Sequence, residues 1–304
     1  MRARSVFLTG ATGFIGRNLA AALVPQQVHV LSRSGSNVGS LAGIDGIHFH
    51  NYDGTTESLI RALDCAKPEI VYHLAAHFVA EHKTADIEPL ISSNILLGAQ
   101  LLEAMSMTGV HRLINTGTSW QHYQNQEHRS VCLYAATKQA FEGLIDFYTD
   151  ARGLIAITLQ LFDTYGPSDP RPKLFNLLLN ADISKPLQFS EGKQLLDLVY
   201  IDDVIRAFVI AEERVIQQTS PSHERFAVSS GAPRPLREIV ETFLAITRSG
   251  LRIEWGKRPY RAREVMQPWT PYTSVPGWSP RVEMQEGFAS LLSSRKGSNS
   301  TVDR

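Results

Sequence analysis

The stretch SVFLTGATGFIG, residues 5–16, decides the fold of this chain of 304 residues. It opens with five mainly apolar or β-branched residues, Ser5–Thr9, a pattern typical of a buried strand. Phe14–Val24 follows with apolar residues such as Ile15 and Leu19 at helical spacing. The stretch therefore predicts a strand, a tight glycine turn and a helix at the start of the chain.

Three glycines in this turn, Gly10, Gly13 and Gly16, stand three residues apart. One glycine in the turn and one facing a pyrophosphate let backbone N–H groups approach the ligand, and the third allows close contact between helix and strand. The position between a strand and a helix favours a dinucleotide site over a glycine-rich turn with no ligand.

Strand-like and helix-like segments alternate through the first half of the chain. The expected strands are Val28–Ser32, Ile47–His50, Glu69–Ala75, Arg112–Gly117 and Leu154–Leu161. The expected helices are Thr55–Leu63, a long one that ends at Gly109, and Tyr134–Tyr148. This order predicts an α/β fold, a Rossmann doubly wound parallel sheet with a smaller C-terminal α/β substrate-binding lobe.

The second half of the chain is much richer in proline, because only three of the fifteen prolines precede Gly166. We expect residues 1–166 to form the dinucleotide-binding domain, with later strands returning to its sheet. Residues 167–292 are expected to form mainly the substrate lobe, with its last helix at Met284–Leu292. Residues 293–304 are polar and are expected to be a disordered tail.

Composition excludes several classes of protein. Thirty basic residues balance thirty acidic ones, which argues against a nucleic-acid binder. Cys65 and Cys132 are too few for a disulfide framework, so a reducing, cytoplasmic location is expected. The histidines show no metal-ligand spacing, and no continuous apolar run is long enough to cross a membrane.

The end of the second expected strand bears on the choice of dinucleotide. An acid there usually holds the ribose 2′-OH of NAD, but Ser32, Arg33 and Ser34 stand in its place and the next acid is Asp45. A guanidinium suits a 2′-phosphate, which predicts NADP(H), with NAD(H) as the alternative. The opposing interpretation is that Arg33 is only a solvated loop cation.

Candidate catalytic residues lie in LYAATKQAFEGL and just before it. Tyr134 and Lys138 are four residues apart on one helix face, and an ammonium lowers the pKa of a neighbouring phenol. Thr118 and Ser119 follow the expected strand Arg112–Gly117, where a hydroxyl can bind a substrate carbonyl. We therefore expect proton transfer to or from an alcohol or sugar oxygen.

Taken together, GATGFIG, HLAA (His73–Ala76), Asn94, the hydroxyl pair and YAATK resemble the extended short-chain dehydrogenase/reductase family. The chain looks most like the NAD(P)-dependent nucleotide-sugar epimerases, dehydratases and reductases. LFDTYGP (Leu161–Pro167) and LDLVYIDDV (Leu196–Val204) match landmarks of that family's substrate lobe. The resemblance runs from Ser5 to about Leu292.

The resemblance implies roles for single residues. Tyr134 is the acid/base, Lys138 lowers its pKa and binds the nicotinamide ribose, and Thr118 polarises the carbonyl. The implied cofactor contacts are Gly10, Thr12, Gly13, Phe14, Ile15, Gly16, Ser32, Arg33, Asp53, Gly54, Leu74, Ala75, Ala76, Asn94, Thr116, Tyr134, Lys138 and Phe162. The implied substrate contacts are Thr118, Ser119, Asp163, Lys173, Leu174, Asn176 and Arg261, with Arg263 contesting the place of Arg261.

Departures from the family pattern narrow the expected reaction. The 4,6-dehydratases carry an acid pair after the catalytic threonine, whereas Ser119 and Trp120 follow it here. Asp163 stands where many relatives carry asparagine, and Leu196 replaces a phosphate-binding arginine. The late motifs resemble the nucleotide-4-keto-6-deoxyhexose reductases, a group that includes the CDP-abequose and CDP-paratose synthases.

We therefore expect an NADPH-dependent reductase of a CDP- or dTDP-linked 4-keto-6-deoxyhexose, in deoxysugar and O-antigen (lipopolysaccharide) biosynthesis. The alternatives are an NAD-dependent nucleotide-sugar 4-epimerase and a non-catalytic dinucleotide sensor. The resemblance also implies a homodimer formed through two long helices, Ile87–Met107 and Leu133–Ala151. No nucleic acid, membrane or metal partner is expected.

Overall fold

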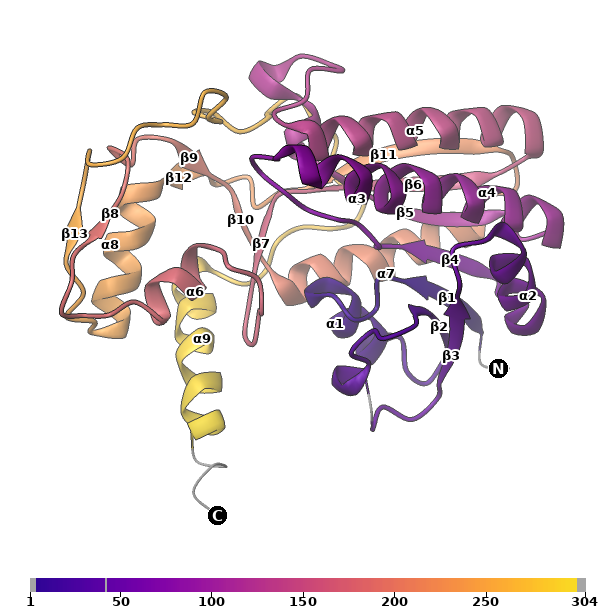
Figure 1. Cartoon of the computed structure of the whole chain (residues 1–304), viewed down its shortest axis with the longest axis horizontal. Helices are drawn as coiled ribbons and strands as arrows, with labels where there is room; N and C mark the ends of the chain where they lie inside the picture. The colour runs from indigo at the N-terminus through magenta and orange to yellow at the C-terminus, as the bar shows by residue number, and fades with distance from the viewer. Residues whose placement is uncertain (1–3, 42, 300–304) are drawn as a thin grey trace.

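The main body of the protein is a parallel sheet between two layers of helices (Figure 1). The computed structural model describes residues 4–41 and 43–299. The strands of the sheet are β1 (Ser5–Thr9), β2 (Gln27–Arg33), β3 (Ile47–Tyr52), β4 (Ile70–His73), β5 (Arg112–Thr118), β6 (Ile155–Leu161) and β11 (Ser222–Val228), in the spatial order β11–β6–β5–β4–β1–β2–β3. The expected Rossmann α/β fold is confirmed.

Each face of the sheet is covered by its own helices. Helices α1 (Phe14–Leu23) and α7 (Ile201–Gln217) pack on one face. The other face is covered by α2 (Thr56–Ala66), α3 (Ile87–Ile91), η3 (Ser92–Leu96), α4 (Leu97–Thr108) and α5 (Leu133–Arg152). The short helical turns are η1 (Gly39–Leu41), η2 (Thr84–Asp86), η4 (Ser119–Gln121) and η5 (Tyr123–Asn125).

The alternation of side chains along β1 shows why the sheet needs both layers. Val6 and Leu8 are fully buried in the cluster beneath α1 and α7. Phe7 points the other way and is fully buried in the cluster beneath α2, α4 and α5. A strand that is apolar on both faces is stable only when both faces are covered, as parallel sheets require.

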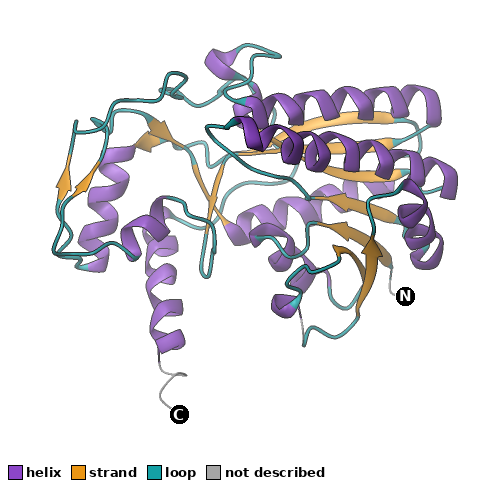
Figure 2. Ribbon diagram, in the orientation of Figure 1, coloured by secondary structure: helices purple, strands orange, loops and turns teal. Residues whose placement is uncertain are grey.

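A smaller lobe lies beside the carboxyl ends of the strands (Figure 2). It contains β7 (Asp163–Tyr165), α6 (Leu174–Leu179), β8 (Leu187–Gln188), β9 (Leu195–Leu196), β10 (Leu198–Tyr200), β12 (Arg234–Pro235), α8 (Leu236–Thr247), β13 (Ile253–Glu254) and α9 (Met284–Asn299). Between these pieces, α7 and β11 return to the sheet, so the expected boundary at 166/167 divides the two lobes only in part.

Two elements, β4 and the last helix, end at residues other than those predicted. β4 ends at His73 instead of Ala75, because the chain leaves the sheet there and runs along the edge of the cavity described below. The last helix continues to Asn299, seven residues past the predicted end at Leu292. It therefore includes part of the tail that was expected to be disordered, and residues 300–304 lie outside the described part of the chain.

The long helical run Thr84–Thr108 passes a length and hydropathy test for a membrane span, with a mean hydropathy of 1.2 over its most apolar window. Within that window 44% of the residues are buried inside the fold, which is also what a core helix shows. The run is interrupted by the π-helical turn η3, and this turn carries the buried side chain of Asn94.

Two helical glycines give a matched test of the packing between α4 and α5. A Cβ at Gly98 would lie 2.3 Å from the ring of Phe141, so Gly98→Ala should destabilise the fold by about 1–3 kcal/mol. Exposed Gly143 has open space around its Cβ position, so Gly143→Ala should stabilise helix α5 by up to about 1 kcal/mol. Urea unfolding measures both, and equal effects in the two variants would contradict this packing argument.

Candidate active site

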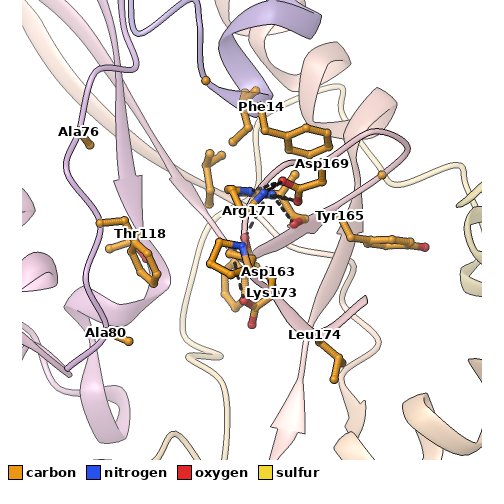
Figure 3. A pocket seen from close by; sticks show the side chains of 18 of the residues that line it. Phe14, Ala76, Ala80, Thr118, Asp163, Tyr165, Asp169, Arg171, Lys173 and Leu174 are labelled. Atoms are coloured by element: carbon orange, nitrogen blue, oxygen red, sulfur yellow. Dashed lines mark hydrogen bonds and ion pairs between the residues drawn. The ribbon is translucent and has the colours of Figure 1, made fainter. Parts of the chain in front are cut away.

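A cavity of about 960 Å³ lies at the carboxyl edge of the parallel sheet, where the small lobe meets it. Its walls come from the glycine turn after β1, the loop after β4, the end of β5, the start of α5 and the segment from Leu161 to Asn180. Figure 3 shows Phe14, Thr118 and Lys173 among the side chains that surround it. Ligands bind at this edge in open α/β sheets.

The glycine turn forms one end of the cavity with very little room for side chains. Gly10 has a φ of +75°, and a Cβ there would lie 2.5 Å from the backbone nitrogen of Ala75. A Cβ at Gly16 would lie 2.1 Å from the carbonyl oxygen of Gly10. The turn leads into α1, whose first turn carries no acidic residue. Backbone N–H groups and a helix N-terminus are therefore available to an anion such as a pyrophosphate.

The three candidate catalytic residues meet in the middle of the cavity wall. Thr118 ends β5, while Tyr134 and Lys138 lie one turn apart near the start of α5. The Nζ of Lys138 donates a hydrogen bond of 3.3 Å to Thr116 Oγ1, and Thr116 donates to the carbonyl of His73 at 3.0 Å. Thr118 Oγ1 accepts from the backbone N–H of Trp120 at 3.3 Å, which leaves its own O–H free to donate.

Burial dominates the proton affinities of this group. It lowers the pKa of Lys138 to about 8, and Glu142 opposes that effect. It also raises the pKa of the Tyr134 phenol above its ordinary value, with Arg171 as the cation that opposes this effect. The structure thus does not bear out the expected lowering of this pKa by Lys138, whose ammonium is directed to Thr116.

Aromatic side chains form an apolar wall next to Tyr134. The ring of Phe78, which is 48% exposed, meets Tyr134 edge-on at 4.9 Å and lies 5.9 Å from Trp120. The sequence patterns did not identify Phe78, because it lies on the loop after β4 and is brought to the site by tertiary contacts that no local pattern predicts. A wall of this kind suits an apolar group of a ligand near the acting hydroxyl.

A second residue that the sequence analysis missed is Arg171. Its guanidinium binds the carboxylate of Asp169 through Nε and Nη2 and lies 4.6 Å from the ring of Phe14 (Figure 3). Its Nη2 also donates to the carbonyl of Thr164 at 2.9 Å. Arg171 thereby links the loop before α6 to the first turn of α1, and its charge faces the cavity.

The small lobe contributes further charged groups. Lys173 Nζ lies 4.0 Å from Asp163 Oδ1, and both side chains line the cavity. Arg261 also lines the cavity, with its guanidinium paired to Glu264 at 2.9 Å. Arg263 donates instead to the carbonyls of residues 130 and 131, outside the lining. The structure thus separates the two arginines that the sequence could not.

Most of the expected site residues lie in the cavity wall. Those in the lining are Gly10, Gly13, Phe14, Ile15, Gly16, Leu74, Ala76, Thr116, Thr118, Ser119, Tyr134, Lys138, Phe162, Asp163, Lys173, Leu174, Asn176 and Arg261. Those outside it are Thr12, Ser32, Arg33, Asp53, Gly54, Ala75 and Asn94.

Two of the outlying residues have clear structural contacts. Asn94 is buried and exchanges hydrogen bonds with the backbone of His77, so it holds the loop after β4 in place. The carboxylate of Asp53 accepts from the N–H and hydroxyl of Thr55 at the start of α2 and pairs with Arg61 at 3.3 Å. Their cofactor contacts remain predictions.

Within residues 4–41 and 43–299 no group of histidine, cysteine, aspartate or glutamate side chains could hold a metal ion. The closest approach of histidines is on β2 and β3, where His29 Nδ1 lies 2.8 Å from His50 Nε2. Burial, together with the neighbouring His50 and His48, lowers the pKa of His29 to about 4.

Known proteins similar to this chain are enzymes of nucleotide sugars. The sequence profile of the NAD dependent epimerase/dehydratase family matches residues 6–223. A CDP-abequose synthase of Yersinia pseudotuberculosis is 28% identical over 274 residues, covering 89% of this chain and 93% of that protein. A UDP-glucose 4-epimerase of Mycolicibacterium smegmatis is 26% identical and covers 94% of this chain and 96% of its own length.

Solved structures share the fold. The UDP-glucose 4-epimerase of Thermus thermophilus, crystallised with NAD, superposes with a TM-score of 0.80 at 24% identity and covers 96% of this chain and 99% of its own. The UDP-glucose 4-epimerase of Thermotoga maritima superposes with a TM-score of 0.81 at 20% identity, and the match covers 97% of this chain and 99% of that chain.

The buried histidine below the site makes stability depend on pH. Burial lowers the pKa of His73 to about 3, whereas an unfolded histidine titrates near 6.5. Between these values the unfolded chain binds more protons, so stability falls as the pH is lowered through this window. From pH 7 to pH 4 the stability advantage of the wild type over His73→Gln should shrink by about 3 kcal/mol in urea unfolding. An advantage that does not change with pH would contradict the assignment.

Proposed function

Because the chain belongs to the NAD dependent epimerase/dehydratase family, we propose that it uses NADPH to reduce a CDP- or dTDP-linked 4-keto-6-deoxyhexose to a deoxysugar. The observation that carries this proposal against a dehydratase is that no acid directly follows Thr118 in the cavity wall. Thr118 is followed by Ser119 and Trp120, and the lining acids Asp163 and Asp169 each pair with a cation. Elimination across a hexose ring needs such a carboxylate, whereas reduction does not.

The apolar wall and the similar proteins support the substrate class. The ring of Phe78 lies beside Tyr134 and contacts Trp120, and this aromatic surface can pack against the methyl group of a 6-deoxyhexose. CDP-abequose synthases of Yersinia pseudotuberculosis and Salmonella typhimurium are 28% and 24% identical to this chain. Arg261, Lys173 and Arg171 are the cations of the cavity wall that the substrate diphosphate would contact, and each already pairs with one carboxylate.

The glycine turn fits a dinucleotide, because Gly10 and Gly16 let the turn pack closely against the backbone of Ala75 and of Gly10 itself, with the N-terminus of α1 at the cavity. When bound, the reduced nicotinamide supplies a hydride to the keto carbon. Thr118 donates its free O–H to the keto oxygen. Tyr134, whose phenol is protonated at neutral pH, delivers the proton to that oxygen. Lys138 stays fixed against Thr116 beside them.

The cofactor preference rests on the end of β2. Arg33 is exposed there, and no described residue pairs with its side chain, so it is available to the 2′-phosphate of NADP(H). Both neighbouring serines donate hydrogen bonds to β3. Ser32 donates to the carbonyl of His50 at 3.5 Å, and Ser34 donates to the side chain of Asn51 at 3.1 Å.

A UDP-sugar 4-epimerase with retained NAD is the second candidate, favoured by the solved structures and by the Mycolicibacterium smegmatis relative. The groups at Thr118, Tyr134 and Lys138 would serve either reaction. We favour the reductase because Arg33 suits NADP(H), a cofactor that is consumed and exchanged rather than retained.

We further propose a cytoplasmic homodimer that serves O-antigen or related deoxysugar biosynthesis. Ile87, Ile91 and Leu96 expose apolar side chains along α3 and η3, and Phe147 does so on neighbouring α5. Two such helix pairs would cover each other's apolar residues in a four-helix interface. Sedimentation of the wild type and of Phe147→Glu would test this dimer.

Removal of the Arg33 charge tests the choice of cofactor. Arg33→Ala should weaken NADPH binding by about 1.5–3 kcal/mol, the range for a charge-assisted hydrogen bond, and leave NADH binding nearly unchanged. Fluorescence titration with both cofactors measures this. Arg234→Ala removes an exposed cation from the small lobe and is the control. Equal affinity of the wild type for both cofactors would contradict the preference.

Removal of one hydroxyl tests the acid. Tyr134→Phe should lower turnover by at least about 10²-fold while cofactor binding persists, because the ring still packs but has no proton to give. Tyr148→Phe, on the same helix with its hydroxyl 2.6 Å from Glu103, is the matched control and should keep its activity. A near-normal rate for Tyr134→Phe in stopped-flow assays would remove Tyr134 from the mechanism.

The stoichiometry of the cofactor separates the two candidate reactions. When the enzyme is incubated with a CDP- or dTDP-4-keto-6-deoxyhexose, one NADPH should be oxidised for each sugar that is reduced. The absorbance at 340 nm measures the NADPH, and NMR identifies the sugar product. Epimerised sugar that forms without NADPH consumption would establish the epimerase instead.

A further inference from the structure

A chain of polar contacts, buried at its inner end and exposed at its outer end, runs from the candidate catalytic residues to the far edge of the sheet. Lys138, Glu142 and Asp146 are spaced by four residues on one face of α5. Lys138 and Glu142 are 2% and 1% exposed. Arg225, on β11, donates from Nε to Glu142 at 2.7 Å and from Nη2 to Asp146 at 2.7 Å.

The second carboxylate oxygen of Glu142 reaches the strand that carries Thr118. It accepts from Gln121 Nε2 at 2.7 Å, and Gln121 Oε1 accepts from the backbone N–H of Thr118 at 2.8 Å. An ionised carboxylate can only accept, so Glu142 fixes which end of the Gln121 amide faces Thr118. Gly117 leaves room for this amide, since a Cβ there would lie 2.9 Å from Gln121 Oε1.

We propose that Glu142 is a positioning residue of the active site. Through Gln121 it fixes the backbone that carries Thr118, and it places a carboxylate one helical turn from the Lys138 ammonium. This inference rests on the proposed function only in taking Thr118 and Lys138 as reacting groups. If Glu142 served folding alone, neither the orientation of the Gln121 amide nor the negative sign of the Glu142 charge would be required.

The other charged and titratable groups around this contact chain leave Glu142 as the anion that faces Lys138. His73, on β4, is buried with a pKa of about 3 and is neutral at pH 7. His122 and His223 also face Glu142, and burial lowers the pKa of both. Arg225 lies on the opposite side of Glu142 from Gln121 and balances part of its charge.

The charge is tested by NMR titration of protein labelled with ¹³Cε-lysine, with the Lys138 signal assigned from Lys138→Arg. Glu142→Gln should lower the pKa of Lys138 by about one unit, whereas Arg225→Gln should raise it. Asp146→Asn removes the other carboxylate bound to Arg225 and is the matched control, with a much smaller shift. No shift in Glu142→Gln, or an equal shift in Asp146→Asn, would overturn the electrostatic role. Should Glu142→Gln fail to fold, the direction of the shift in Arg225→Gln decides.

The positioning is tested by hydrogen exchange at the Thr118 amide. Glu142→Gln and the uncharged Gln121→Met should accelerate this exchange at least about tenfold, and Gln121→Met should leave the pKa of Lys138 unchanged. Wild-type exchange in Gln121→Met would overturn the positioning role. Both readouts work without substrate, so they are separable from a failure of the proposed reaction. Where turnover is measured, the alkaline limb of kcat should move to lower pH in Glu142→Gln and stay in place in Asp146→Asn.

Discussion

The parallel direction of all seven strands is the constraint on which the site depends. Because every strand ends at the same edge, the turn after β1, the loop after β4 and the hydroxyls after β5 converge without any long excursion of the chain. The closest part of this convergence is at Gly10, where the first turn passes so near the backbone of Ala75 that no side chain fits. The cavity is therefore bounded by backbone on this side, and its other side is left for the small lobe.

Burial sets the chemistry of the groups that meet there. Lys138 is almost completely buried, so its charge is maintained only by nearby oxygens and by the carboxylate one helical turn away. The same burial raises the pKa of the Tyr134 phenol, so the phenol holds its proton more tightly than a solvated tyrosine does. Burial thus favours the neutral form of both side chains, and for Lys138 the negative charge of Glu142 opposes that effect.

The sequence predicted the sheet and the centre of the site because both depend on local order. Strands such as Ser5–Thr9 and helices such as Thr56–Ala66 follow from periodicity, and their bounds were predicted to within a few residues. Tyr134 and Lys138 follow from helical spacing. Phe78 and Arg171 could not be predicted, because each reaches the cavity from a loop whose path is set by tertiary contacts, with Tyr134 and Phe14 respectively. The choice of Arg261 over Arg263 likewise required the contacts of each guanidinium.

The two lobes divide the work in a way that explains why fold and catalytic residues leave the net reaction open. In the proposed mechanism a hydride and a proton move at one carbon beside Thr118, Tyr134 and Lys138, all of which the sheet domain supplies. Whether that carbon is reduced once, or oxidised and then reduced, depends on whether the cofactor leaves between turnovers. The proposed cofactor contact Arg33 lies on the exposed end of β2, and the proposed sugar contacts Asp163 and Lys173 lie in the small lobe. The fold and the catalytic side chains therefore do not set the net reaction by themselves, and a change of reaction within one fold would arise at contacts of this kind.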